Sequence, residues 1–273
     1  TAEGQEILSD LAEYVRRLRG LSELERQLAA WLELEQVVVV PGDSDQDESV
    51  KKELGRAAAS YLERILTDGM TLAVTGGTTM TGVAAAVGRL HLQKTVLVVP
   101  ARGGMGEEVE KQANTVAAAM AKGIGGCYRL LHVPDDLGAR ARESIMHDPK
   151  IEELLTLIKA ADVVVHGIGT AEEMASRRGL SPKQSAFLHD CGAVGEAFGY
   201  YFDQKGKIVY TTSSIGLSYG DLASIKKVVA VGGGKKKTAA ALAGLSNQYQ
   251  HILITDEGAA RRMVALGGDE ETR

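Results

Sequence analysis

The stretch Leu72–Met80 combines the pattern of a buried strand with a turn that could bind an anion. Its sequence, LAVTGGTTM, places two glycines and two threonines after an apolar run and before a helix of small residues. Gly76 and Gly77 let the backbone turn tightly and approach a ligand. The hydroxyls of Thr78 and Thr79 lie where a helix leaves its first N–H groups unpaired and its dipole positive. We expect these four residues to bind a phosphate, although similar turns also close ordinary β–α units.

Basic residues follow two other predicted strands. Arg102 comes just after the strand at 95–100, where a guanidinium can form two hydrogen bonds with a phosphate. Lys235, Lys236 and Lys237 follow three glycines and begin a helix, where three cations oppose the helix dipole unless an anion is bound. We expect Lys237 to bind a second phosphate. The alternatives are a surface ion pair for Arg102 and, for the three lysines, a row of solvated charges.

Other polar residues are candidates for the rest of such a ligand. We expect Gln112 and Glu196 to bind sugar hydroxyls, since neither cancels the charge of a phosphate and Glu196 lies among small and apolar residues. Arg177 is a further ligand candidate that could equally be solvated. His166 begins a glycine turn, and a single histidine at the end of a strand is more often structural.

Arrangements typical of catalysis or of metal binding are not recognisable. The Gly-x-Gly-x-x-Gly fingerprint of dinucleotide sites is incomplete, and neither residue order nor spacing suggests a Ser–His–Asp or Cys–His pair. The acidic loop at 43–47 lacks the glycine and the final glutamate of a calcium loop, which favours a solvated helix cap. We therefore expect a binding protein with no cofactor and no metal.

Composition limits the classes of function. The net charge of −5 over 273 residues argues against nucleic-acid binding by this chain itself. No apolar run approaches the roughly 18 residues that span a bilayer, so we expect no membrane contact. Cys127 and Cys191 are isolated thiols, which favours a reduced cytoplasm.

Strand and helix patterns alternate along almost the whole chain. Apolar runs typical of strands buried on both faces lie at 37–40, 72–75, 95–100, 128–133, 162–166, 228–231 and 251–255. We predict an α/β fold, a Rossmann-like doubly wound and mostly parallel sheet, with a small inserted segment at 187–215 that contains an antiparallel pair. The turns at 76–79, 102–104, 167–170 and 232–237 should then converge on one crevice.

The N-terminal residues predict two helices. In the first, at 5–21, a 4-3-4-3 spacing of apolar residues is typical of a coiled coil, which could pack on its own domain, link domains or form a dimer seam; the spaced residues are Ile7, Leu11, Tyr14, Leu18 and Leu21. A second helix should open at Ser22, with Glu25 completing a capping box.

Six separate motifs resemble one family. They are VTGGTT at 74–79, PARGG at 100–104, QANT at 112–115, VHGIG at 165–169, EAFGYYF at 196–202 and TDEGAA at 255–260. Together they are similar to the effector-binding domain of SorC-type transcriptional regulators over nearly the whole chain. The resemblance implies a fold like that of sugar-phosphate isomerases and glucosamine-phosphate deaminases. It further implies a repressor of glycolytic genes that senses a phosphosugar, chiefly fructose 1,6-bisphosphate, and that is released from its operator through a change of oligomer.

The resemblance also implies which residues contact the effector and how the chain is divided. The family's phosphate and sugar contacts correspond to Gly77, Thr78, Thr79, Arg102, Gln112, Arg177, Glu196 and Lys237. Residues 1–21 would be a linker or oligomerisation helix and 22–273 the effector domain of a dimer or, on DNA, a tetramer. The family's helix-turn-helix domain, which binds the operator, is expected to be absent from this chain. The alternative is an isomerase- or deaminase-like enzyme, but the Asp-Gly-His run of the deaminases is missing after Gly169.

Overall fold

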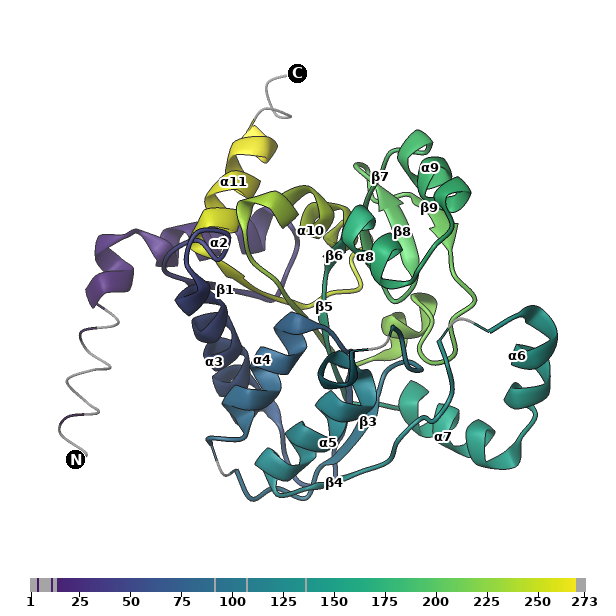
Figure 1. Ribbon diagram of the computed structural model, residues 1–273. Helices are drawn as coiled ribbons and strands as arrows, with labels where there is room; N and C mark the ends of the chain where they lie inside the picture. The colour runs from purple at the N-terminus through teal and green to yellow at the C-terminus, as the bar shows by residue number, and fades with distance from the viewer. Residues whose placement is uncertain are drawn as a thin grey trace.

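Within the described residues, seven parallel strands form the central sheet (Figure 1). The computed structural model describes residues 14–90, 92–106, 108–135 and 137–268, together with Gly4 and Leu11. The strand order is β1-β11-β10-β5-β2-β3-β4. The strands are β1 (Gln36–Val40), β2 (Thr71–Val74), β3 (Leu97–Pro100), β4 (Cys127–Tyr128), β5 (Val163–Gly167), β10 (Lys227–Val231) and β11 (Ile252–Asp256). The apolar runs of the sequence therefore form a doubly wound parallel sheet, as predicted.

Helices cover both faces of this sheet. On one face α3 (Glu48–Ile65), α4 (Thr78–Val87) and α5 (Ala113–Ile124) pack on alternate strand residues such as Val74 and Val165. The other face is covered by α2 (Leu21–Trp31), α10 (Thr238–Leu245) and α11 (Glu257–Gly268) at one end, and by α7 (Pro149–Lys159) at the other. Because successive strand side chains point to opposite faces, a strand covered on both sides must be apolar throughout.

The direction of winding reverses between β2 and β5. From β2 the chain continues to β3 and β4 on one side, whereas from β5 it continues to β10 and β11 on the other. Thr75 joins the two strand ends, since its N–H donates to the Val165 carbonyl (3.2 Å) and its Oγ1 accepts from the Gly167 N–H (3.4 Å). In open α/β sheets ligands bind at such a switch point, beyond the carboxyl ends of the strands.

A second, antiparallel sheet lies beside this point (Figure 1). In the described residues it contains β6 (Gly169–Thr170), β7 (Ala193–Ala197), β8 (Tyr200–Asp203) and β9 (Ile208–Thr211), with α8 (Ala171–Arg177) and α9 (Pro182–Asp190) between β6 and β7. The antiparallel pair that we predicted is β8–β9. The inserted segment begins at β6, well before the predicted start at residue 187. The two residues of β6 and the seven of α8 are too few to leave a periodic pattern in the sequence.

The predicted strand at 128–133 is wrong beyond Tyr128. Leu131 instead pairs with a side chain: its N–H donates to Asn114 Oδ1 (3.0 Å) and its carbonyl accepts from Asn114 Nδ2 (3.1 Å). This amide replaces a neighbouring strand, and the chain leaves the sheet. After it, α6 (Ala139–Met146) extends away from the sheet (Figure 1).

The N-terminal predictions are corrected in part. Helix α2 begins at Leu21, after Gly20 in the left-handed region, so the capping box expected at Ser22 does not form. Glu25 accepts instead from the Val39 N–H (2.7 Å) and from Arg16 (2.6 Å). Of the helix expected at 5–21, residues 5–10 and 12–13 lie outside the described part. None of the described helices has the length and hydrophobicity needed to cross a membrane.

Candidate functional site

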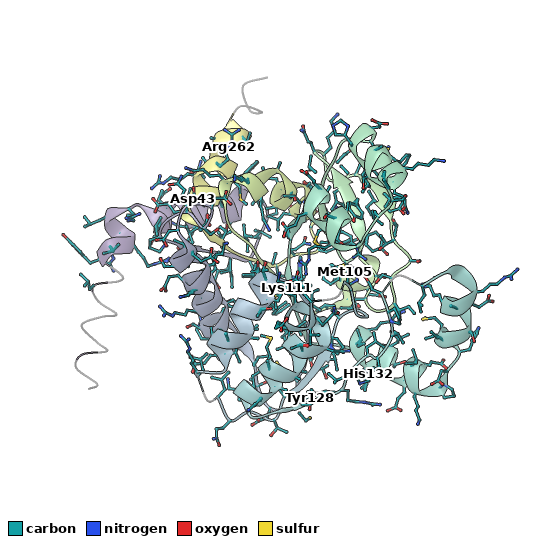
Figure 2. All side chains as sticks on the ribbon, viewed as in Figure 1. Asp43, Met105, Lys111, Tyr128, His132 and Arg262 are labelled. Carbon is teal, nitrogen blue, oxygen red and sulfur yellow. The ribbon has the colours of Figure 1, made fainter. Side chains whose placement is uncertain are left out.

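A cleft lies at the switch point, beyond the carboxyl ends of β2 and β5. Its cavity volume is about 80 Å³, and residues of the turns at 76–79, 102–104, 167–170 and 232–237 line it, as expected from the fold. The segment that carries Met105 and Lys111, both labelled in Figure 2, completes the wall. All nine candidate residues border the cleft: Gly76, Gly77, Thr78, Thr79, Arg102, Gln112, Arg177, Glu196 and Lys237.

The glycine turn is shaped by close packing against the segment that follows α4 and β3. A Cβ on Gly76 would lie 2.2 Å from the Lys111 carbonyl oxygen, and Gly77 has a φ of +114°. The Gly77 N–H donates to the same carbonyl (2.8 Å), so it is not free for a ligand. The first turn of α4 follows at Thr78, and no described residue accepts from the N–H groups of Thr78 or Thr79. The positive end of α4 therefore opens on the cleft.

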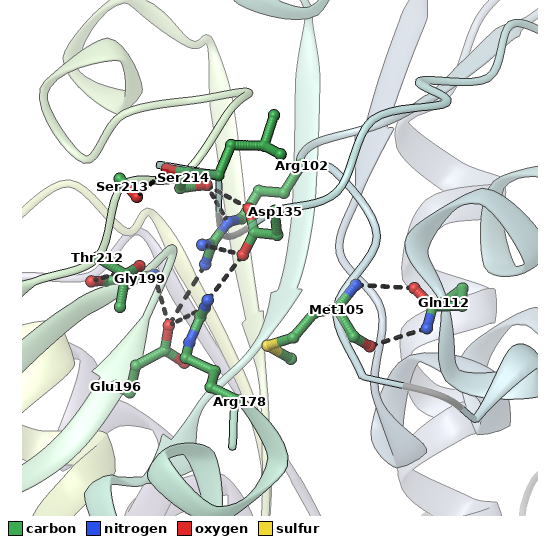
Figure 3. Close-up of polar contacts among 11 residues, drawn as sticks. Arg102, Met105, Gln112, Asp135, Arg178, Glu196, Gly199, Thr212, Ser213 and Ser214 are labelled. Atoms are coloured by element: carbon green, nitrogen blue, oxygen red, sulfur yellow. Dashed lines mark hydrogen bonds and ion pairs between the residues drawn. The ribbon is translucent and has the colours of Figure 1, made fainter. Parts of the chain in front are cut away.

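Arg102 is buried in ion pairs, not held open as a phosphate fork. Its Nη2 lies 2.6 Å from Asp135 Oδ2, its Nη1 lies 3.3 Å from Glu196 Oε1, and its Nε donates to Ser214 Oγ (2.8 Å) (Figure 3). Only 9% of the side chain is exposed. Neither the open fork nor the surface ion pair that the sequence suggested describes this arrangement.

A second arginine completes the cluster from the other side. Arg178 Nη1 lies 2.7 Å from Asp135 Oδ2, and its Nη2 lies 3.0 Å from Glu196 Oε1 (Figure 3). Burial alone would lower the pKa of Arg178, but the carboxylates of Glu196 and Asp135 outweigh it and raise the pKa. Arg178 is therefore a permanent cation. With Arg102 included, two cations face two anions, so the buried cluster carries no net charge.

Sequence reasoning missed Arg178 and Asp135. Arg178 stands next to the candidate Arg177, and the sequence does not indicate which of the two arginines points inward. Asp135 follows the irregular segment after β4, where no periodicity predicts burial. Glu196 also accepts from the Gly199 N–H within the β7–β8 turn, which fixes its carboxylate beside both arginines.

The Gln112 amide is engaged with backbone groups of the cleft wall. Its Oε1 accepts from the Met105 N–H (2.9 Å), and its Nε2 donates to the Met105 carbonyl (2.8 Å) (Figure 3). The Nε2 also donates to the Gly106 carbonyl (2.8 Å). These bonds hold the segment after β3 against the start of α5. A sugar contact by Gln112 stays a prediction, whereas its positioning of this wall is a feature of the structure.

Two cations lie toward the open part of the cleft. Arg177 Nη1 lies 3.6 Å from the point that a Cβ on Gly77 would occupy, so its guanidinium lies beside the start of α4. Lys237 Nζ lies 2.8 Å from Glu173 Oε2 on α8. Both side chains of the ion pair between Lys237 and Glu173 are partly exposed, 31% for the lysine and 38% for the glutamate.

The three lysines form a short 3₁₀ turn, η3 (Lys235–Lys237), before α10. Asp43 Oδ2 lies 3.4 Å from Lys235 Nζ, and Asp45 Oδ2 accepts from the Lys236 N–H (2.8 Å). The acidic loop at 43–47 thus contacts the lysine turn, through one ion pair and one backbone hydrogen bond, which the sequence did not predict. Its last member, Asp47, caps α3 by accepting from the Ser49 N–H, in line with the capping role expected.

His166 is a structural residue next to the cleft. It is fully buried, its Nδ1–H donates to the Gly167 carbonyl (3.1 Å), and its ring lies 4.8 Å from that of Phe198, which lines the cleft. Burial lowers its pKa to about 4, so the imidazole is neutral near pH 7. Within the described residues, no group of three or more His, Cys, Asp or Glu side chains could hold a metal ion.

Comparison with known proteins places this fold and cleft in one family. The sequence profile described as "Putative sugar-binding domain" matches residues 16–265. The central glycolytic genes regulators of Priestia megaterium and Bacillus subtilis are 46% and 42% identical, each over 97% of this chain and 78% of its own length. The chain belongs to the sugar-binding domain family of SorC-type transcriptional regulators.

A solved structure agrees with this assignment. The protein, described as a "putative SorC family transcriptional regulator" from Enterococcus faecalis, is 42% identical, with a TM-score of 0.83 over 89% of this chain and 99% of its own. In this SorC-family chain five of the six family motifs contribute residues to the cleft lining, and the sixth, at 255–260, lies outside it. These relatives are described as transcriptional regulators and not as enzymes.

Proposed function

We propose that this chain is the effector-binding domain of a cytoplasmic repressor of glycolytic genes, and that its effector is a phosphorylated sugar, chiefly fructose 1,6-bisphosphate. The observation that carries the proposal is the cleft at the switch point, where the unpaired N–H groups of Thr78 and Thr79 open beside Arg177 and Lys237. Backbone donors at a helix N-terminus together with guanidinium and ammonium groups bind phosphate well.

The distribution of these groups favours two phosphates. The start of α4 with Arg177 forms one anion-binding group, and Lys237 on the lysine turn forms another. Arg102, Gln112 and Glu196 would contact the sugar or a phosphate between them, as the family resemblance implies. Charge-assisted bonds contribute on the order of 1.5–3 kcal/mol each, so two such groups support micromolar binding.

Effector binding should also change the conformation of the domain. A cavity of about 80 Å³ is smaller than the roughly 300 Å³ at which pockets for drug-sized ligands begin. We expect the cleft to widen around a sugar bisphosphate, and a ligand that binds the wide state better shifts the population toward it. We propose that this shift alters a homo-oligomer, dimeric or tetrameric, and so releases operator DNA that is bound by a helix-turn-helix domain.

Binding without turnover is part of the proposal. Among the described residues, three carboxylates line the cleft and each is in an ion pair: Asp135 and Glu196 with buried arginines, and Glu173 with Lys237. A carboxylate that acts as general acid or base must be able to change protonation beside the substrate. The names of the relatives, all of them transcriptional regulators, agree with a sensor.

Calorimetric titration with fructose 1,6-bisphosphate, fructose 6-phosphate and dihydroxyacetone phosphate tests the proposal. We expect the bisphosphate to bind tightest and to remain unconsumed. Arg177→Ala should weaken binding at least tenfold and Thr79→Val several-fold, whereas Arg142→Ala, exposed on α6, should have no effect. Absence of binding by any phosphosugar, or steady consumption of one, contradicts the proposal. Light scattering with and without saturating bisphosphate tests the oligomer change separately.

A further inference from the structure

The ion pair between Glu173 and Lys237 lies where the cleft meets a larger groove. This groove runs between α3 and α4 and has a cavity volume of about 530 Å³. Thr78, Thr79, Glu173 and Lys237 line both the groove and the cleft, whose own volume is about 80 Å³. The pair therefore stands at the boundary between the cleft and this larger groove.

We propose that Glu173 is a specificity-determining residue that competes with the effector's phosphate for Lys237. This inference rests on the proposed function. The Glu173 carboxylate lies 2.8 Å from Lys237 Nζ, so it already neutralises the cation and engages one of the three N–H donors that a phosphate would use. A phosphate that binds Lys237 competes with Glu173 for this cation, and both partners are exposed enough to separate. When they separate, the boundary between cleft and groove opens.

The position of Glu173 on α8 supports this competing role. Glu173 and Arg177 are four residues apart and so lie on one face of the helix, and both line the cleft. One side chain thus presents a negative charge and the other a positive charge to the same ligand. A carboxylate carries one negative charge and a phosphate monoester about 1.5 to 2 near pH 7, so a phosphate displaces Glu173 where a hydroxyl does not.

The charge of Glu173 can be removed without disturbing the helix. The helix cap uses the backbone, because the Glu173 N–H donates to Thr170 Oγ1 (3.2 Å). Glu173→Gln keeps the size and that bond. Glu172→Gln is the matched control, since Glu172 lies in the same helical turn and is exposed, but does not line the cleft.

Titration of the variants with fructose 1,6-bisphosphate tests the inference. We expect Glu173→Gln to tighten binding at least fivefold and Glu172→Gln to change it less than twofold. In a Lys237→Gln background, the gain from Glu173→Gln should fall below twofold, because there is no longer a cation to release. Equal or weaker binding by Glu173→Gln, or a gain that persists without Lys237, overturns the inference.

Inorganic phosphate and pyrophosphate separate this inference from the proposed function. If the wild-type chain binds no phosphosugar, the proposed effector is wrong, and the same variants are then titrated with these two anions. Tighter anion binding by Glu173→Gln than by the wild type and Glu172→Gln, dependent on Lys237, upholds the competition. No difference between Glu173→Gln and the wild type, or no binding by either, refutes it.

Discussion

Arg178 Nη1 lies 2.7 Å from Asp135 Oδ2, with only 1% and 2% of the two side chains exposed. The pair joins α8 and the second sheet to the segment that follows β4, and both residues also contact members of the cleft wall: Arg178 contacts Glu196, and Asp135 contacts Arg102. The cleft is thus built on a buried, electrically neutral base. Its candidate ligand residues Arg102 and Glu196 are held in place by two residues that do not themselves need to touch a ligand.

Removal of one member of this cluster should destabilise the domain strongly. Arg178→Met leaves Asp135 and Glu196 with one arginine between them, and an uncompensated buried charge costs roughly 3–5 kcal/mol. Denaturant unfolding measures this loss. Arg129→Met, which removes the partner of exposed Glu153, is the control and should change stability little. A comparable small change for Arg178→Met would show that the buried pair does not hold the fold.

Gly199 should be irreplaceable because Arg102 passes next to it. Its φ is +83°, and a Cβ there would lie 2.4 Å from Thr212 Oγ1 and 2.7 Å from Arg102 Nη2. Gly199→Ala should therefore cost roughly 1–2 kcal/mol for the backbone alone, and more for displacing the guanidinium. Gly192→Ala isolates the backbone part, since Gly192 has a φ of +69° and open space around it.

The two alanine variants are compared by denaturant unfolding and by effector titration. Gly199→Ala should lose more stability than Gly192→Ala and should weaken phosphosugar binding, because Arg102 has moved. Equal stability losses, with unchanged binding in both, would mean that the contact with Arg102 is accommodated without displacement.

The central sheet could be predicted from the sequence because burial on both faces leaves a local signal. The runs Val37–Val40 in β1 and Ile252–Ile254 in β11 are apolar without interruption, and glycine turns follow the strands that border the cleft. The alternation of strand and helix then fixes where the turns gather. Five of the six family motifs lie on or next to these turns, which is why all the candidate residues border one cleft.

The partners of these residues could not be predicted because they are set by contacts between distant segments. Arg102 meets Asp135 and Glu196 across 33 and 94 residues of sequence. Arg177 and Arg178 are neighbours, yet one lies beside the start of α4 and the other is buried in the charge cluster. Successive helix residues differ in direction by about 100°, and on a seven-residue helix the apolar pattern is too short to orient them.

The role of Gln112 can be separated from ligand contact by measuring the free protein. Gln112→Glu keeps an acceptor for the Met105 N–H but loses the donor to the carbonyls of Met105 and Gly106. We expect the backbone around Met105 to loosen, and its amide hydrogen exchange to accelerate, without any effector present. Gln184→Glu on α9 is the control, since Gln184 lies outside the cleft. Unchanged exchange at Met105 would assign Gln112 to ligand binding alone.

Buried, neutral His166 should make the domain sensitive to acid. Burial lowers its pKa to about 4 from an ordinary value of 6.5, so the unfolded chain takes up the proton first as the pH falls through this window. The folded state then loses stability, by about 2 kcal/mol between pH 7 and pH 5. His166→Gln cannot titrate and should lack this part of the loss, whatever its stability at pH 7. His189→Gln, at an exposed position, should keep the wild-type pH dependence. Denaturant unfolding at both pH values measures the difference, and equal losses for His166→Gln and the wild type would show that His166 is protonated in the fold without cost.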